Sequence, residues 1–394
     1  KPLGLISNSC WLIAAISVLL RMSVMRATGV LLASVLAHGV EQRSSPGCTR
    51  SMLPAAGLHQ RYITVADFEP VERTYWIEIP EGLSRTVQSK ASPLLFAFHG
   101  QGGHGNDFAG MHKFAEIGRS DGLIAVFPQG MDDSYPGEEQ GTGWNVGSGG
   151  DNETCVLAGV GAYHGCYKSC RKLKQCGRCN WSTCYDDVLF VRSVIAAVAE
   201  ELCVDLNRIY AQGESNGAEL VHHLVRELPA TFAGISTWYG TPLLGYLLGG
   251  QKQLMRGRNR LSRTAILALH GRNDTTIPAE GGVTDGGWLF EPLEQSTGVW
   301  SFVHHCEPTA TPLTTRWDGG PLNFRCSEYK SCASCRRIVQ CMYDGKHGDW
   351  PVGMAGDEIT LWFLLRFSRG SDNQCQDDAI EDEDEQPTYT VYMV

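Results

Sequence analysis

With 394 residues, the chain is long enough for one large α/β domain with additional segments, or for two small domains. Hydrophobic residues make up 43% of it, which is ordinary for a globular protein with a buried core. The net charge of −10 is mostly local, because eight acidic residues lie in residues 371–394, which contain no Lys or Arg. The rest of the chain is close to neutral, which argues against a nucleic-acid partner. We expect residues 371–394 to be an acidic, disordered tail.

The N-terminal segment has a pattern typical of protein export. Two apolar runs, residues 10–20 and 29–37, are separated by arginines. Each run is shorter than the about 20 residues that a spanning helix needs, which disfavours an uncleaved signal anchor and any stable membrane span. The second run combines a basic start, an apolar centre and small residues at its end. We therefore expect a targeting segment in residues 1–39, with a signal peptide at about 22–39, and a secreted protein.

Cysteine usage agrees with export. Apart from Cys10 in the targeting segment, the chain has an even number of cysteines, which suits disulfide bonds in an oxidising compartment. Six of them lie in a segment, residues 151–184, that has the appearance of an insertion: Cys155, Cys166, Cys170, Cys176, Cys179 and Cys184. The Cys176-x-x-Cys179 spacing could bind zinc, but a secreted chain favours disulfides there. The same interpretation applies to Cys326, Cys332, Cys335 and Cys341, and the pairing is not deducible from sequence.

Strand and helix patterns alternate along the rest of the chain. Short β-branched and aromatic runs predict strands at residues 62–65, 73–79, 93–98, 123–128, 208–212, 232–238, 264–270 and 337–342. Helical periodicity predicts helices at residues 106–120, 186–203, 220–228 and 357–367. This alternation is typical of an α/β fold, in which a mostly parallel sheet has helices on both faces. Since no internal repeat or linker is visible, we expect one catalytic domain at about residues 58–370.

A tight turn lies at the centre of this pattern. The strand at residues 208–212 leads into Gly213-Glu214-Ser215-Asn216-Gly217, and a helix follows. Strand, sharp turn and helix with a serine at the apex form the nucleophile elbow of α/β-hydrolases, in which the glycines avoid collisions with neighbouring backbone. Gly-x-Ser-x-Gly alone is a permissive pattern, but this context makes Ser215 a candidate nucleophile.

Two partners for Ser215 follow later strands. Asp274 comes after the strand at residues 264–270 and His347 after the strand at residues 337–342, so the order is Ser, Asp, His, as in the α/β-hydrolase fold. An imidazole must remove the serine proton, and a carboxylate must orient the imidazole. His270 ends a buried strand and is expected to pack in the core. The remaining candidates lack this context: His222, His223, His304, His305, Asp285 and Asp318.

The glycine-rich loop at residues 99–105 follows the strand at residues 93–98. Glycines there could simply allow the chain to turn. In this position of an α/β-hydrolase, however, a backbone N–H is expected to bind the developing oxyanion. We assign the oxyanion hole to the N–H groups of Gln101 and Asn216. A phosphate site is disfavoured, because no Lys-Ser or Lys-Thr follows.

Several motifs together resemble a known family. They are His99-Gly100-x-Gly102-Gly103, Gly143-Trp144-Asn145-Val146-Gly147, Asp186-Asp187-Val188-x-Phe190-Val191, Arg208-Ile209-Tyr210-Ala211-x-Gly213-x-Ser215-Asn216-Gly217 and His270-Gly271-x-x-Asp274-x-x-Ile277-Pro278. As a set, over residues 70–365, they resemble the secreted feruloyl esterase and polyhydroxybutyrate depolymerase group of esterases. The resemblance implies an α/β-hydrolase fold and hydrolysis of carboxylic esters, commonly feruloyl groups on polysaccharides. It implies the triad Ser215, Asp274 and His347. We expect no cofactor and no metal.

Other functions and local departures stay open at this point. The alternatives are a polyhydroxyalkanoate depolymerase, for which no appended substrate-binding domain is visible, and a non-catalytic binding protein on a hydrolase scaffold. Glu214 fills a variable position, and no consequence is expected from it. Glu219 stands where an apolar residue is usual, and we expect it to reshape the pocket. Trp144 and Trp350 flank the site, where they could bind substrate by stacking or could simply pack.

Overall fold

The structure is a computed structural model of the full chain. It describes residues 43–50, 54–81, 83, 90–133, 141–147, 167–175, 183–247, 264–284, 287–319, 322–333, 336–350 and 355–369. The chain divides into Lys1–Gly39 and Val40–Val394, and all described residues lie in the second unit. The predicted targeting segment, the predicted acidic tail and most of the cysteine-rich segment lie outside the described residues. Among the helices that are described, none is long and apolar enough to cross a membrane.

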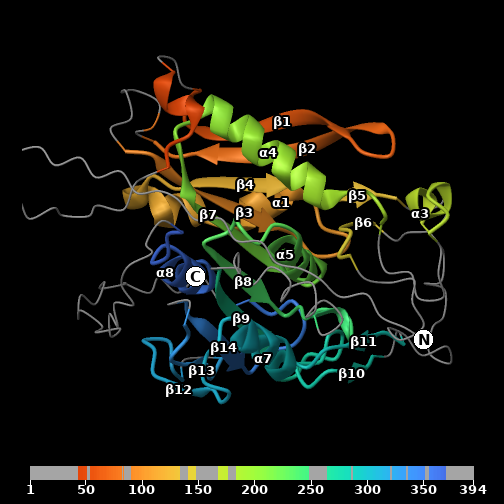
Figure 1. The fold of residues 1–394 in the computed structure, drawn as a ribbon, viewed down its shortest axis with the longest axis vertical. Coiled ribbons are helices and arrows are strands. Elements are labelled where there is room, and N and C mark those ends of the chain that lie inside the picture. Colours follow the sequence, from red (N-terminus) through yellow and green to blue (C-terminus); the bar gives the residue numbers. More distant parts are fainter. Residues whose placement is uncertain are drawn as a thin grey trace, which may run out of the picture. The chain divides into compact units, whose positions relative to one another are not determined.

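A ten-stranded sheet forms the centre of the domain (Figure 1), in the order β1-β2-β4-β3-β7-β8-β9-β14-β13-β12. The strands are β1 (Gly57–Ala66), β2 (Pro70–Ile79), β3 (Ser92–Phe98), β4 (Ile124–Pro128), β7 (Val204–Glu214), β8 (Gly234–Trp238), β9 (Ala265–Gly271), β12 (Thr311–Leu313), β13 (Arg325–Tyr329) and β14 (Ile338–Tyr343). Strands β4, β3, β7, β8, β9 and β14 are parallel, and the outer strands pair antiparallel. Covered by helices on both faces, this sheet is the predicted α/β-hydrolase fold.

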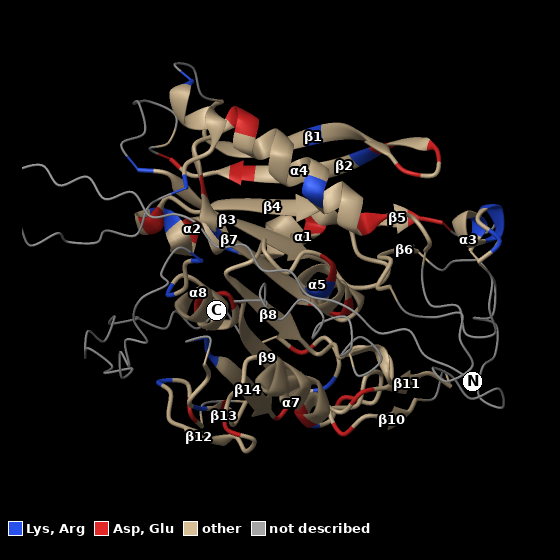
Figure 2. Cartoon of the chain, viewed as in Figure 1, with Lys and Arg blue, Asp and Glu red and all other residues tan. Residues whose placement is uncertain are grey.

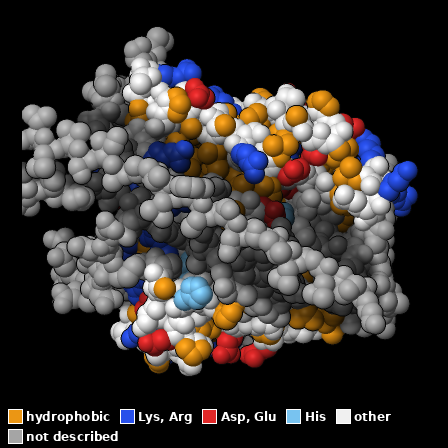
Figure 3. Space-filling model, in the orientation of Figure 1, with side chains coloured by type: hydrophobic (Ala, Val, Ile, Leu, Met, Phe, Trp, Pro, Cys, Tyr) orange, Lys and Arg blue, Asp and Glu red, His pale blue; other side chains and the backbone are white. Residues whose placement is uncertain are grey.

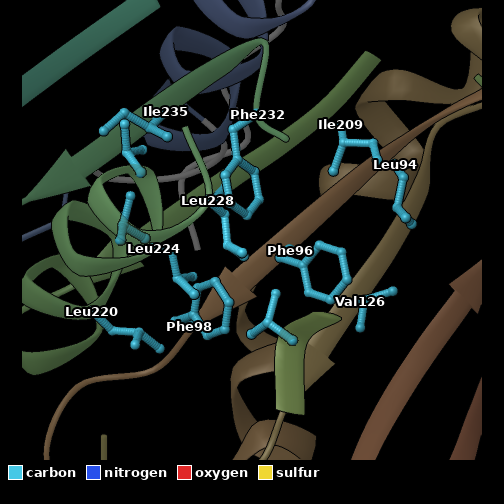
Figure 4. Close-up of a cluster of buried hydrophobic side chains, with 14 of the residues drawn as sticks. Leu94, Phe96, Phe98, Val126, Ile209, Leu220, Leu224, Leu228, Phe232 and Ile235 are labelled. Carbon is cyan, nitrogen blue, oxygen red and sulfur yellow. The ribbon is translucent and has the colours of Figure 1, made fainter. Parts of the chain in front are cut away.

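Alternate residues of each central strand pack into different cores. Along β3, Phe96 and Phe98 belong to one buried cluster, whereas Leu95 and Ala97 belong to the other. The first cluster, shown in Figure 4, packs under α4 (Asp187–Glu201), α5 (Asn216–Glu227) and α7 (Leu293–Val303). The second packs under α1 (Gly105–Met111), α2 (Phe114–Ile117) and α8 (Ala355–Leu364). Each fully buried phenylalanine or leucine contributes about 1.5–3 kcal/mol, so both helix layers are fixed to the sheet.

The predicted helix at residues 106–120 is broken, which is a correction to the sequence analysis. The structure has α1, α2 and the short 3-10 helix η2 (Gly118–Asp121) instead. The break falls at His112, whose backbone is extended, with φ −104° and ψ 149°. The His112 side chain is buried and bonded to Asp357 of α8, so a tertiary contact overrides local helix propensity.

Several elements were not predicted, most of them short. They are η1 (Pro46–Thr49), β5 (Met131–Asp132), β6 (Thr142–Gly143), α3 (Lys168–Lys172), β10 (Gly282–Val283), β11 (Leu289–Phe290), α7, β12 and β13. Figure 2 shows Lys and Arg gathered on α3, while the central strands β3, β4, β8 and β9 carry no Lys, Arg, Asp or Glu. In the space-filling view, hydrophobic and charged side chains are mixed over the described part of the visible face (Figure 3).

Disulfides link the described segments. The pairs are Cys48–Cys203, Cys170–Cys184, Cys306–Cys332 and Cys326–Cys341. Cys326–Cys341 joins β13 to β14, and Cys306–Cys332 ties the end of α7 to the segment after β13. The disulfide interpretation is therefore confirmed for the described cysteines. The Cys176-x-x-Cys179 pair lies outside the described residues.

Candidate active site

The predicted triad residues meet at one edge of the sheet. Ser215 follows β7, Asp274 follows β9 and His347 follows β14, and all three strands are parallel. His347 Nε2 lies 2.9 Å from Ser215 Oγ, and His347 Nδ1 lies 2.8 Å from Asp274 Oδ2. The structure therefore brings the three residues into one hydrogen-bonded chain. This is the geometry in which an imidazole can accept a serine proton.

Ser215 occupies a strained turn. Its φ of 52° and ψ of −121° lie outside the regions that ordinary residues favour, which costs on the order of 1–3 kcal/mol. The Ser215 N–H donates to Trp238 O at 3.0 Å. A Cβ on Gly213 would lie 2.2 Å from Gly217 O, and one on Gly217 would lie 2.4 Å from Phe98 O. Only glycine fits at both positions, as the turn motif predicts.

The surroundings of Asp274 favour its ionised form. One carboxylate oxygen accepts the backbone N–H groups of Thr276 and Ile277, both at 2.9 Å, while the other faces His347. Burial raises the pKa of Asp274, but the hydrogen bonds from His270 and His347 outweigh it and hold the pKa below its usual range. The ionised carboxylate favours a proton on His347 Nδ1, which leaves Nε2 to receive the serine proton.

His270 is a core residue, as predicted. Its side chain is buried, and its Nε2 donates to Ile277 O at 2.6 Å while lying 3.4 Å from Asp274 Oδ2. His270 therefore supports the loop that carries Asp274. The other histidines excluded by sequence context do not contact the triad residues in any described hydrogen bond or ion pair; His222, for example, is buried and accepts from the indole N–H of Trp300 at 3.2 Å.

The glycine-rich loop after β3 lies against the nucleophile. A Cβ on Gly100 would lie 3.2 Å from Ser215 Cβ and 3.8 Å from its Oγ. The loop is held by the Gly102 N–H, which donates to Thr142 O at 2.7 Å. Gln101 lies between these two glycines, and Asn216 begins α5, where an N–H has no acceptor within the helix. Both segments are thus next to Ser215, and the oxyanion role of Gln101 and Asn216 stays a prediction.

Buried His99 holds this loop in shape. Its Nδ1 donates to Gly100 O at 2.7 Å, and its Nε2 accepts the Gly130 N–H at 3.0 Å. Burial lowers the pKa of His99 to about 4, so the ring is neutral and has one donor and one acceptor. That protonation state matches both bonds, and the loop after β3 is anchored to the segment after β4.

Trp144 packs in the core rather than lining open space. It is fully buried, and its ring lies edge-on against Phe98 at 5.3 Å. Its backbone N–H donates to Asn216 Oδ1 at 2.8 Å, and its indole N–H donates to His99 O at 2.8 Å. Of the two interpretations offered for Trp144, the structure favours packing. Trp144 connects the two segments predicted to form the oxyanion hole.

Glu219 lies on the helix that follows the nucleophile. Its side chain is buried, and its Oε2 accepts from Asn216 Nδ2 at 3.0 Å. It therefore supports the first turn of α5 from within, and the expectation that it reshapes the pocket stays a prediction. The contact of an Asn and a Glu at (i, i+3) on one helix was the available sequence signal.

Trp350 is partly exposed and packs on its inner side. Its ring lies 4.0 Å from Trp238 and 5.1 Å from His112, measured between ring centroids. A Cβ on Gly356 would lie 2.2 Å from its indole, so α8 approaches it closely. The packing interpretation accounts for these contacts, and a substrate-binding role for the exposed part stays a prediction.

The fold and the site define a class: an α/β-hydrolase with a serine, a histidine and an aspartate in a hydrogen-bonded chain. No protein-family model matches the chain. The chain is similar to feruloyl esterase C from Emericella nidulans, with 24% identity over 82% of this chain and 93% of that protein. It is also similar to a probable feruloyl esterase C from Aspergillus niger, with 22% identity over 82% and 91%. The predicted resemblance to feruloyl esterases is confirmed.

Solved structures also match the chain, at low sequence identity and low TM-score. One is an acetyl xylan esterase from Aspergillus awamori, with 13% identity, a TM-score of 0.47, and coverage of 77% of this chain and 98% of that one. Another is an S-formylglutathione hydrolase from Agrobacterium tumefaciens, with 11% identity, a TM-score of 0.44, and coverage of 80% and 98%. Fold, site geometry and curated relatives agree on a serine carboxylic-ester hydrolase.

Proposed function

We propose that this protein is a secreted feruloyl esterase-like enzyme that cleaves ester-linked acyl groups from polysaccharide. The observation that carries the proposal is the continuous hydrogen-bonded chain from Ser215 through His347 to Asp274 at the carboxyl ends of parallel strands. The partial exposure of Ser215 and His347 lets an ester reach the serine hydroxyl.

The reaction proceeds in two halves. His347 Nε2 takes the proton of Ser215 as Oγ attacks the ester carbonyl, and the N–H groups of Gln101 and Asn216 bind the oxyanion. His347 then gives that proton to the departing alcohol oxygen, which leaves an acyl group on Ser215. Water, deprotonated by His347, attacks the acyl carbonyl, and His347 returns this proton to Ser215 Oγ as the carboxylic acid leaves. One ester and one water thus yield one alcohol and one acid, and the enzyme is restored. Asp274 stabilises the imidazolium in both halves.

The substrate class is supported by the relatives. Two proteins that are similar to this chain over most of their length are named feruloyl esterase C and probable feruloyl esterase C. Disulfides such as Cys48–Cys203 and Cys306–Cys332 suit an oxidising compartment and support secretion. No metal or cofactor takes part in the proposed steps.

The decisive variant is Ser215→Ala. Turnover of p-nitrophenyl acetate and labelling by a fluorophosphonate probe should both be lost, while circular dichroism and thermal unfolding stay unchanged. Ser193→Ala is the matched control, because Ser193 bonds only locally to Leu189 O on α4, and it should keep both signals. Retained turnover in Ser215→Ala would contradict the proposal.

A substrate panel tests the acyl specificity. Methyl ferulate and feruloylated arabinoxylan should be hydrolysed with higher kcat/KM than 3-hydroxybutyrate oligomers. Faster release of hydroxybutyrate would favour a polyhydroxyalkanoate depolymerase. Absence of fluorophosphonate labelling in the wild type would favour a non-catalytic binding protein on the same scaffold.

A further inference from the structure

A second histidine–carboxylate pair lies directly behind the nucleophile. His112 Nδ1 lies 2.7 Å from Asp357 Oδ1, and His112 Nε2 lies 3.2 Å from Glu214 Oε1. Glu214 is the residue immediately before Ser215. All three side chains are buried. Residues 214 and 215 therefore each contact a histidine that is bonded to an aspartate.

The buried group is charged. Burial lowers the pKa of His112, but the hydrogen bond with Asp357 and the ion pair with Glu214 outweigh it and raise the pKa to about 9. His112 is thus a cation at neutral pH, enclosed by two carboxylates. The second oxygen of Asp357 accepts the Lys113 N–H at 2.7 Å. Such a group is costly to bury and persists only when its members are well paired.

Tyr239 connects Glu214 to the catalytic imidazole. It directly follows β8, and its hydroxyl donates to Glu214 Oε2. Its ring lies edge-on to the His347 ring, with centroids 5.2 Å apart and planes at 71°. Its φ of 37° is unusual for a tyrosine, and its N–H donates to Leu269 O at 2.8 Å. The Tyr239 side chain thus contacts β7 through its hydroxyl and His347 through its ring.

Asp357 connects the same group to the segment that carries His347. It lies in the first turn of α8, which is the element that follows the His347 loop. Trp350, between His347 and α8 in the chain, packs edge-on against the His112 ring at 5.1 Å. His112 therefore joins β7, the strand that leads into Ser215, to α8, the helix that follows the His347 loop.

We propose that His112, Glu214 and Tyr239 are positioning residues of the triad, which together hold the strained Ser215 turn and the His347 ring at reactive separation. The inference rests on the proposed function. Ser215 and His347 follow different strands and are joined by one hydrogen bond between their side chains, and this group connects the two segments a second time. A displacement of about 1 Å between reacting groups costs on the order of a hundredfold in rate.

Tyr239→Phe tests the link to His347 with the smallest change. It removes the hydroxyl bonded to Glu214 and keeps the ring that packs on His347. We expect kcat for p-nitrophenyl acetate and the rate of fluorophosphonate labelling to fall about tenfold, with KM unchanged. Tyr210→Phe is the matched control, since Tyr210 lies within β7, the strand that leads into Ser215, and its buried hydroxyl donates to Phe367 O at 2.7 Å. Equal rates in the two variants, at equal thermal stability, would overturn the proposal.

Glu214→Gln tests the coupling. If Tyr239 acts through Glu214, the double variant that combines Tyr239→Phe with Glu214→Gln should lose less kcat than the product of the two single losses. Multiplicative losses would overturn the proposal, and Tyr239→Phe remains informative if Glu214→Gln folds poorly. Fluorophosphonate labelling of the wild type distinguishes failure of the proposed function from failure of the positioning role. If the wild type is not labelled, the proposed function is wrong. If the wild type is labelled and the variants are labelled equally fast, only the positioning role is wrong.

Discussion

Two histidine–aspartate pairs flank the tight turn at Ser215. They differ in the group that lies next to Nε2 of each histidine. His347 and Asp274 are 2.8 Å apart, and His112 and Asp357 are 2.7 Å apart. The His347 side chain is 23% exposed and meets the Ser215 hydroxyl, whereas the His112 side chain is 3% exposed and meets the Glu214 carboxylate. The pair itself is therefore not what makes a site reactive.

The third partner and the solvent decide the chemistry. A hydroxyl donates to His347 Nε2, so that nitrogen has a lone pair available for the serine proton. A carboxylate at Nε2 of His112 holds a proton there instead, and burial excludes the substrate. In the proposed mechanism the first pair exchanges protons, whereas the second is a fixed charge within the scaffold.

The largest expected effect comes from breaking the exposed pair. Asp274→Asn should lower kcat for p-nitrophenyl acetate by about 10⁴, because the amide favours the wrong tautomer of His347. The buried amide can still accept from Thr276 and Ile277, so the protein should stay folded. Steady-state kinetics and thermal unfolding of the same preparation check both parts. A loss of less than tenfold in a folded variant would contradict the assignment of Asp274.

The same substitution in the buried pair should affect stability instead. Asp357→Asn removes one of the two carboxylates that compensate His112, and breaking such a buried pair costs about 3–5 kcal/mol in the free energy of unfolding. Urea unfolding measures this loss. We expect kcat of the folded fraction to fall far less than in Asp274→Asn. Equal kinetic losses in both variants would mean that the two pairs do not have separate roles.

The sequence identified the exposed pair and missed the buried one for a physical reason. Ser215, Asp274 and His347 each follow a recognisable buried strand, and parallel strands bring their carboxyl ends together. His112 and Asp357 are separated by 245 residues and lie within helical patterns, where nothing local marks a tertiary partner. The helix predicted over residues 106–120 is broken for this same contact.

Other differences have the same origin. Glu214 was expected to have no consequence because motif spacing says nothing about which side of β7 it faces. Glu219 was judged by helix position alone, whereas its contact with Asn216 depends on how α5 begins. Trp144 could not be assigned to packing or stacking until its burial was known.

The pH dependence of stability sharpens the comparison further. The pKa of His112 is about 9 in the folded protein, above the ordinary value of 6.5, so protonation stabilises the fold. This contribution, on the order of 3 kcal/mol, should be complete below pH 6.5, fall as pH rises and be lost above about pH 9. Urea unfolding at pH 6.5 and pH 9 should show the loss in the wild type and not in His112→Gln. Identical pH dependence in both proteins would contradict a charged His112.

The smallest expected effect concerns Trp144, which joins the loop after β3 to the start of α5. Trp144→Phe deletes the indole N–H bond to His99 O and keeps an aromatic ring against Phe98. A buried hydrogen bond of this kind contributes about 1 kcal/mol. If that energy serves to place the oxyanion donors, kcat should fall about fivefold while KM stays constant.

Trp300→Phe is the control for this change, because Trp300 is equally buried and its indole N–H donates to His222 Nδ1 at 3.2 Å, within the core under α7. It should lose comparable stability with an unchanged kcat. If both variants lose stability and keep their kcat, Trp144 contributes only to core packing. If only Trp144→Phe loses rate, the loop that carries Gln101 depends on a side chain that the substrate never reaches.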